Sequence, residues 1–139
     1  MKKNILTVEN CNALSYVITS VLGKDYAVTN VENPVDAAEC LYGNEKKDLI
    51  ILDIDQDSDN LELLKHINSS SVLGKIPTVV ISNSDDPSLK NRTVKLGASL
   101  FLTKPFDPVF LSSKVKDLIY ANGEGPQRKR KTVFNLNIF

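Results

Sequence analysis

The sequence predicts an α/β fold in which five parallel strands form a doubly wound sheet covered by five helices. Short apolar runs alternate along the chain with segments whose apolar residues recur every three or four positions. In the segment 48–53, four apolar residues stand without interruption between Asp48 and Asp53, as expected for a central strand with helices on both faces. Three helix starts are marked by a capping side chain followed by proline: Asn33-Pro34, Asp86-Pro87 and Asp107-Pro108.

The first half of the chain contains three predicted strands and two predicted helices. Residues 5–8 are branched and apolar between polar neighbours, which indicates a buried strand. The next segment is a predicted helix that ends near Gly23, a residue suited to a C-terminal cap. Its apolar residues share one helical face: Leu14, Val17, Ile18, Val21 and Leu22. Residues 26–31 alternate as a second strand, and a helix from Asn33 to about Tyr42 separates it from the third strand, 48–53.

The second half repeats the alternation. After the polar stretch 54–60, a third helical face is predicted from four residues: Leu61, Leu63, Leu64 and Ile67. A fourth strand at 78–81 is closed by Ser82, and a helix from Asp86 to Gly97 follows. A short fifth strand at 100–102 precedes a last helix that opens at Asp107. Strict alternation with short connections implies right-handed crossovers, and such sheets bind their ligands at the carboxyl ends of the strands.

Composition indicates one soluble domain. The chain of 139 residues has 42% hydrophobic and 24% charged residues, close to the globular average. The 17 basic and 17 acidic residues cancel, so total charge indicates neither a nucleic-acid partner nor a membrane. Cys11 and Cys40 have no zinc-site spacing, which favours a reduced, cytoplasmic compartment. The apolar run near the N-terminus is too short for a signal-peptide core.

Polar residues gather at the predicted carboxyl ends of four strands. Glu9 and Asn10 follow the first strand, Asp53 ends the third, Ser82 ends the fourth and Lys104 follows the fifth. Since these ends share one edge of a parallel sheet, we expect the five residues to converge there.

This arrangement resembles the receiver domain of two-component response regulators, the CheY-like family. The stretches that carry the resemblance are residues 48–53, 61–64, 76–77 and 97–106, and it covers about residues 3 to 121. It implies a flavodoxin-like sheet of order 2-1-3-4-5, a receiver domain at 1–121 and a separate tail at 122–139. It also implies a signalling protein and not an enzyme.

The resemblance assigns roles to the residues at the strand ends. Asp53 matches the phosphoacceptor, Ser82 and Lys104 match the groups that bind the phosphoryl group, and Phe101 matches an aromatic switch residue that acts with Ser82. Such an aspartate needs its attack assisted by cations that neutralise the phosphoryl oxygens.

The family's Mg²⁺ site corresponds here to Glu9, Asn10, Asp53 and the backbone carbonyl of Asp55. The usual adjacent pair of aspartates is replaced by Glu9 and Asn10, so one carboxylate is missing. Because cation sites depend on the number of charged ligands, we expect weak Mg²⁺ binding.

The loop after Asp53 also departs from the family pattern. It lacks the usual proline and has Asn60 in place of a glycine, although asparagine tolerates a left-handed turn. Asp55 or Asp57 could supply the missing negative charge, or both could be solvated. We expect Asp55, Asp57 and Asp59 to point outward, with no lysine placed to hold a phosphoryl group on them.

The residues of the chain allow three classes of function. The leading hypothesis is a receiver whose Asp53 is phosphorylated by a sensor histidine kinase or phosphotransfer protein and which then contacts a downstream protein or forms a homodimer. The alternative is a phosphorylation-independent pseudo-receiver that acts as a protein-binding module. A nucleotide-binding protein or small enzyme ranks last, because no glycine-rich phosphate loop follows the first strand.

The tail has the composition of a linker followed by a basic cluster, 128–131, and an alternating apolar segment. It could pair with a sheet edge, contact acidic partners or nucleic acid, or remain disordered as chain termini often do.

Overall fold

The computed structural model describes residues 2–55 and 59–121 of the chain. The tail at 122–139 and the loop residues 56–58, with Asp57, lie outside this part, so the interpretations of the tail stay predictions. No helix in the described ranges is long and apolar enough to cross a membrane.

Five strands and five α-helices alternate along the chain, as the sequence predicts. The strands are β1 (Lys3–Val8), β2 (Tyr26–Val31), β3 (Leu49–Asp53), β4 (Thr78–Ser82) and β5 (Leu100–Thr103). The helices are α1 (Asn12–Leu22), α2 (Pro34–Leu41), α3 (Asp59–Ser69), α4 (Pro87–Lys95) and α5 (Pro108–Tyr120). A short 3₁₀ helix, η1 (Leu73–Lys75), precedes β4 and was not predicted.

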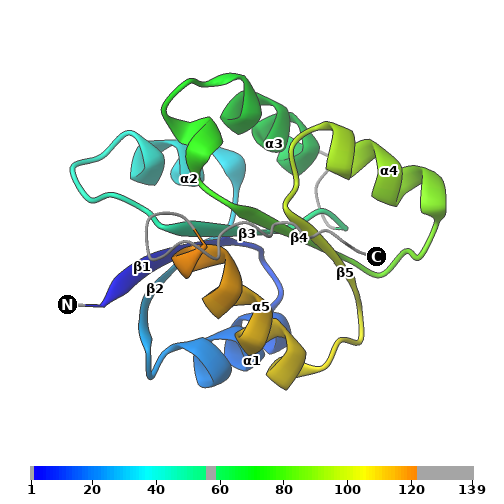
Figure 1. Ribbon diagram of the computed structural model, residues 1–139, viewed down its shortest axis with the longest axis horizontal. Helices are drawn as coiled ribbons and strands as arrows, with labels where there is room; N and C mark the ends of the chain where they lie inside the picture. The colour runs from blue at the N-terminus through cyan, green and yellow to red at the C-terminus, as the bar shows by residue number, and fades with distance from the viewer. Residues whose placement is uncertain (1, 56–58, 122–139) are drawn as a thin grey trace.

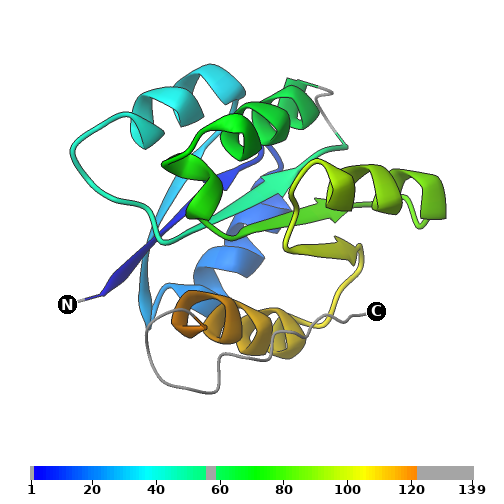
Figure 2. The ribbon, with the colours of Figure 1, turned by 45° about the horizontal axis from the view of Figure 1, so that its top comes forward.

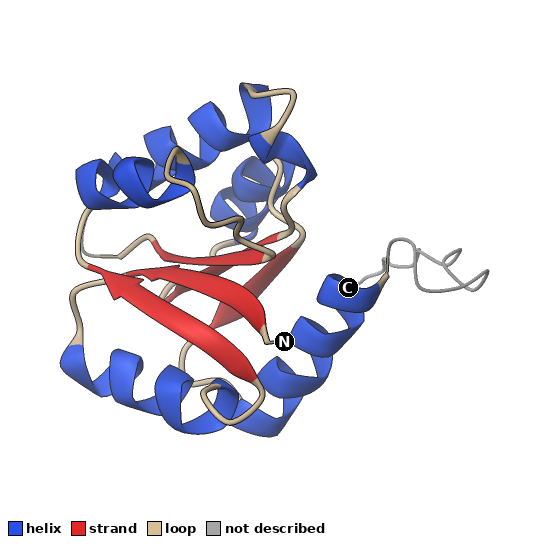
Figure 3. Cartoon of the chain, turned by 90° about the vertical axis from the view of Figure 1, so that its left-hand side faces the viewer, coloured by secondary structure: helices blue, strands red, loops and turns tan. Residues whose placement is uncertain are grey.

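The strands form one parallel sheet of order β2-β1-β3-β4-β5, which confirms the predicted topology. Helices α2, α3 and α4 cover one face, and α1 and α5 cover the other (Figure 1; Figure 2 shows the same two layers after a turn). Viewed from the side in Figure 3, the sheet lies between these two helical layers. Such a sheet has its functional edge at the carboxyl ends of the strands.

Two apolar cores fill the spaces between the sheet and its helical layers. Alternate residues of β3 supply both, because successive strand side chains point to opposite faces. Ile50 and Leu52 pack in the core that includes α2 and α3, whereas Leu49 and Ile51 pack in the core that includes α1 and α5. All four side chains are buried. The continuous apolar run therefore reflects burial on both faces, as expected for this strand.

The three capping motifs form as predicted. The side chains of Asn33, Asp86 and Asp107 accept hydrogen bonds from backbone N–H groups in the first turns of α2, α4 and α5, each with proline in that turn. Helix α4 ends two residues before Gly97, whose φ of 109° lies in the region that favours glycine.

Candidate functional site

The sheet ladder places the candidate residues at one edge. Asp53 ends β3 opposite Ile81 of β4, and the N–H of Ile54 continues the ladder by donating to the Ile81 carbonyl at 3.1 Å. The Lys104 N–H donates to the Ser82 carbonyl at 2.8 Å, one residue beyond β5. Backbone pairing of neighbouring strands therefore sets the positions from which these side chains reach one another.

Asp53 and Lys104 form an ion pair at this edge. The Lys104 ammonium lies 2.9 Å from Asp53 Oδ2, and the other carboxylate oxygen accepts the Asp55 N–H at 2.9 Å. The Asp53 side chain is only 1% exposed, whereas that of Lys104 is 18% exposed. A buried carboxylate depends strongly on such partners, because desolvation without them is costly. The predicted convergence of Asp53 and Lys104 is present in the structure.

Asp55 points into the site, and the prediction that no lysine would be placed near it was wrong. Its carboxylate lies 2.9 Å from Lys104 Nζ and accepts a hydrogen bond from the Ser82 hydroxyl at 2.7 Å. The Asn83 N–H donates to the same carboxylate, at 2.9 Å to Oδ1 and 2.7 Å to Oδ2. The physical reason is local. The Asp55 N–H donates to the Asp53 carboxylate, which holds residue 55 at the end of β3. From there its own carboxylate reaches Lys104, the Ser82 hydroxyl and the Asn83 N–H.

These contacts shift two pKa values in opposite directions. Partial burial raises the pKa of Asp55, but hydrogen bonds from Ser82, Lys104 and Asn83 and the positive charge of Lys104 outweigh it, so the pKa falls below its ordinary value. Burial lowers the pKa of Lys104, but hydrogen bonds to Asp53 and Asp55 and their negative charges raise it above the ordinary value. At neutral pH the lysine and the Asp55 carboxylate are therefore both charged.

Asn60 supports the site from α3. The sequence suggested a left-handed turn at this residue, but Asn60 lies within the helix and is buried. Its side-chain amide donates to the Asp53 carbonyl at 2.6 Å, which ties the end of β3 to α3. The asparagine therefore connects two elements through its side chain. The presence of an asparagine where the family usually has a glycine did not indicate this role.

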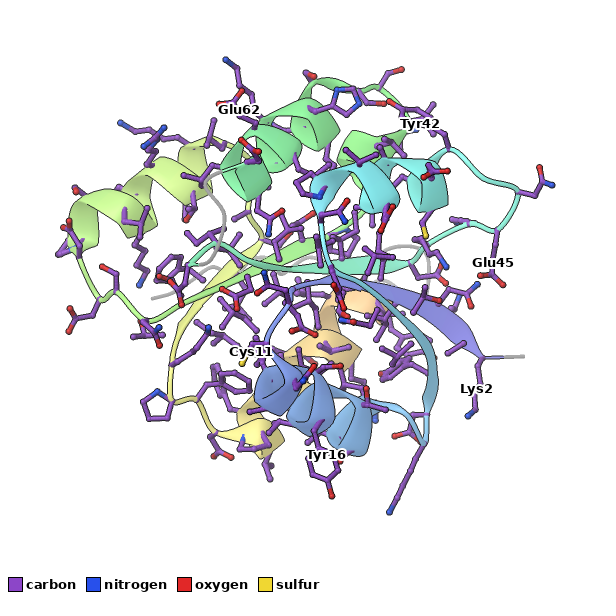
Figure 4. All side chains as sticks on the ribbon, turned by 180° about the vertical axis from the view of Figure 1, so that it is seen from behind. Lys2, Cys11, Tyr16, Tyr42, Glu45 and Glu62 are labelled. Atoms are coloured by element: carbon purple, nitrogen blue, oxygen red, sulfur yellow. The ribbon has the colours of Figure 1, made fainter. Side chains whose placement is uncertain are left out.

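Glu9 and Asn10 are arranged differently from Asp53. Glu9 is buried, and its carboxylate accepts hydrogen bonds from the Cys11 N–H at 2.7 Å and from the Asn30 side chain on β2. Asn10 is exposed beside it. Cys11 immediately precedes α1 and is labelled in Figure 4. Each carboxylate oxygen of Glu9 thus already accepts a hydrogen bond, one from Cys11 and one from Asn30.

The predicted Mg²⁺ ligands at this edge are oxygen atoms. Carboxylate and amide oxygens suit Mg²⁺, but both oxygens of Glu9 and both of Asp53 are already engaged with N–H or ammonium groups. Within residues 2–55 and 59–121, no three Asp, Glu, His or Cys side chains are grouped so as to hold a metal ion. These oxygens suit a cation in kind, but in this arrangement a cation would have to share or displace the groups that Glu9 and Asp53 already hold.

Phe101 lies on β5 opposite Val80 of β4. Its ring is partly buried and packs against the core on the α2, α3 and α4 side of the sheet. The role of Phe101 as a switch residue stays a prediction.

Comparison with known proteins identifies the family. A family model for the response regulator receiver domain matches residues 5–116. The chain belongs to this family. The match lies within the predicted receiver domain and confirms the resemblance in the sequence.

Curated relatives agree with this assignment. The chain is 32% identical over 133 residues to a probable transcriptional regulator, ycf29, of Porphyra purpurea, covering 94% of this chain and 63% of that protein. It is 33% identical over 107 residues to the two-component response regulator ORR11 of rice, Oryza sativa, covering 76% of this chain and 73% of that protein. The chain thus spans less than two thirds of the Porphyra protein's length.

Solved receiver structures have the same fold. A response regulator from Thermotoga maritima matches with a TM-score of 0.77 at 25% identity, covering 86% of this chain and 98% of that one. The phosphorylated cyanobacterial phytochrome response regulator RcpA matches with a TM-score of 0.71 at 26% identity, covering 86% and 93%. The Mn²⁺-bound form of response regulator Rcp1 matches with a TM-score of 0.70 at 26% identity, covering 85% and 92%.

Proposed function

We propose that this receiver domain accepts a phosphoryl group on Asp53 from a sensor histidine kinase or a phosphotransfer protein. The observation that carries the proposal is the ion pair between Asp53 and Lys104 at the carboxyl end of the central strand β3. It places a carboxylate nucleophile beside a cation that can stabilise charge on the transferred group. The phosphorylated relative RcpA gives the same fold a precedent for this chemistry.

The step requires little from the protein beyond position and charge. An oxygen of Asp53 forms a new P–O bond while the P–N bond to the donor histidine breaks, and the departing imidazole regains a proton. The Lys104 ammonium pairs with the Asp53 carboxylate before the reaction. After transfer it would pair with the negatively charged phosphoryl oxygens. A divalent cation, when bound, would neutralise further charge on those oxygens.

We further propose that Mg²⁺ is bound weakly. Asn10 brings no charge to the site, and Glu9 would have to give up its hydrogen bond from the Cys11 N–H or from Asn30 before it could bind a cation. Both effects lower the affinity relative to a receiver with two free aspartates after β1.

The output surface in this proposal is the face formed by α4, β5 and α5. Exposed apolar side chains are present on both helices, among them Val94 on α4 and Val109 and Phe110 on α5. Exposed apolar side chains on these helices are suited to contact with a protein partner, including a second copy of the chain. Phosphorylation would act by favouring one of two conformations of this face.

The test is phosphorylation by a small donor. The protein is incubated with Mg²⁺ and acetyl phosphate, and its intact mass is measured. We expect the wild type and Asp85→Asn, a control at an exposed loop carboxylate, to gain the mass of one phosphoryl group. Asp53→Asn keeps the shape but removes the nucleophile, so it should gain none. Undiminished labelling of Asp53→Asn would rule out Asp53 as the acceptor.

A second candidate function is the phosphorylation-independent binding module. The observation that favours it is that Ser82 and Lys104, the groups assigned to the phosphoryl group, already hold the carboxylate of Asp55. Absence of label on the wild type at saturating Mg²⁺ and donor would support this second function over the first.

A further inference from the structure

Three hydrogen-bond donors converge on the carboxylate of Asp55. They are the hydroxyl of Ser82 at the end of β4, the N–H of Asn83 one residue later, and the ammonium of Lys104 after β5, all within 2.7–2.9 Å. The three donors come from the ends of two neighbouring strands, so the sheet itself holds them together. This is a compact site for an oxyanion.

The donors suit a phosphoryl group as well as they suit a carboxylate. A hydroxyl, a backbone N–H and an ammonium are the groups that proteins use to bind anionic oxygens. The Ser82 hydroxyl and the Asn83 N–H each have a single hydrogen, and both hydrogens are directed at Asp55. A second anion therefore cannot take these bonds while Asp55 holds them.

We propose that Asp55 is a built-in anion that occupies the oxyanion site beside Asp53 and must leave it before a phosphoryl group can be bound there. That Asp55 competes with an anion follows from the contacts alone. That it thereby limits phosphorylation of Asp53 rests on the proposed function. Asp55 would then be a positioning residue that sets how readily the domain is phosphorylated.

The backbone permits this exchange. The Asp55 N–H donates to Asp53 Oδ1, so the peptide at residue 55 stays fixed to the strand end while the side chain rotates about its own Cα–Cβ bond. The Asp55 side chain is 14% exposed, compared with 1% for Asp53. The carboxylate of Asp55 therefore has a path to solvent that the carboxylate of Asp53 lacks.

The first experiment measures anion binding without covalent chemistry. In an Asp53→Asn background, the double variant Asp53→Asn/Asp55→Ala is compared with Asp53→Asn/Asp85→Ala. Both doubles lose the same charge, but only the first frees the donors. Inorganic phosphate is titrated, and the amide resonances of Asn83 and Ser84 are followed by NMR.

We expect phosphate to bind at least tenfold more tightly to Asp53→Asn/Asp55→Ala than to the control double variant. Equal affinity, or no measurable binding to either, would overturn the proposal. Thermal unfolding of both proteins checks that they are folded, and Asp53→Asn/Asp55→Asn, which keeps the side-chain shape with a neutral and weaker acceptor, should give an intermediate affinity.

The second experiment tests the consequence for phosphorylation with Asp53 intact. Wild type, Asp55→Ala and Asp85→Ala are labelled with acetyl phosphate and Mg²⁺, and we expect Asp55→Ala to label several-fold faster than the other two. Equal rates in all three would overturn the role of Asp55 in phosphorylation. If none of the three is labelled, the proposed function fails, while the phosphate titration still decides whether Asp55 occupies the site.

Discussion

Replacing Lys104 with methionine tests the electrostatics of the site. Methionine keeps much of the apolar stem but removes the ammonium that lies 2.9 Å from both Asp53 and Asp55. Removing one partner of a buried pair costs about 3–5 kcal/mol, because an uncompensated charge is left behind. Since the Lys104 side chain is 18% exposed and water can reach the site, we expect a loss of about 2–3 kcal/mol. For a domain of this size that lowers Tm by roughly 6–15 °C.

The penalty should depend on pH in a direction set by the shifted pKa values. The pKa of Asp55 is lower in the folded protein than in the unfolded chain, so its stabilising effect is present above about pH 4 and is lost as the pH falls through its lowered value. The pKa of Lys104 is raised, so its contribution is complete below about pH 10 and declines as the pH rises through the folded value. The difference in stability between wild type and Lys104→Met should therefore be greatest from about pH 6 to 9 and shrink on both sides of that range.

Urea denaturation at several pH values measures this difference, with Lys116→Met on the exposed face of α5 as a control that should change stability by less than about 0.5 kcal/mol. The double variant Asp53→Asn/Lys104→Met should recover part of the loss, because it removes the buried charge that Lys104 compensates. A stability of Lys104→Met within 0.5 kcal/mol of wild type at pH 7, or no recovery in the double variant, would refute the reasoning.

Three further variants test other parts of the structure. Asn10→Asp should tighten Mg²⁺ binding by restoring a carboxylate, and unchanged affinity in a calorimetric titration would contradict the ligand assignment. Asn30→Ala should destabilise the fold by about 1–2 kcal/mol in urea, because the buried Glu9 carboxylate loses a partner, and a neutral effect would show that the bond contributes little. Gly97→Ala should also cost about 1–2 kcal/mol, since φ is 109° and the new Cβ would lie 2.6 Å from the Asn68 side chain, and unchanged stability would mean that the turn adapts freely.

The fold was predictable because its signals are local. Burial on both faces makes β3 continuously apolar, and Asn33, Asp86 and Asp107 cap helices through their own side chains, which the sequence displays directly. The boundaries were less accurate. Strand β1 begins at Lys3, two residues before the predicted start, and β5 extends to Thr103, because these residues pair through backbone groups that carry no mark in the side-chain pattern. The η1 helix was missed since three residues are too few to show a period.

The site was predictable only where a strand end dictates position. Asp53, Ser82 and Lys104 meet the edge of the sheet because the register of neighbouring strands brings them there. The direction of Asp55 was predicted wrongly, because it depends on one hydrogen bond from its N–H to Asp53 and on the attraction of Lys104. The role of Asn60 depends similarly on tertiary contact, since its amide reaches the end of β3 only once α3 has packed.

The chain lacks a carboxylate at Asn10 and has one at Asp55. The number of negative charges is therefore kept, but Asp55 lies at a different part of the site. A cation bound between β1 and β3 would benefit from a carboxylate on that side, whereas Asp55 lies on the side of β4 and β5 with Lys104. A phosphoryl group can take those donors only after the Asp55 carboxylate has left them. Binding of an anion at the end of β4 and β5 is therefore coupled to the movement of one side chain. We therefore expect removal of the Asp55 carboxylate to ease access of an anion to these donors, without restoring the charge that Asn10 lacks beside β1.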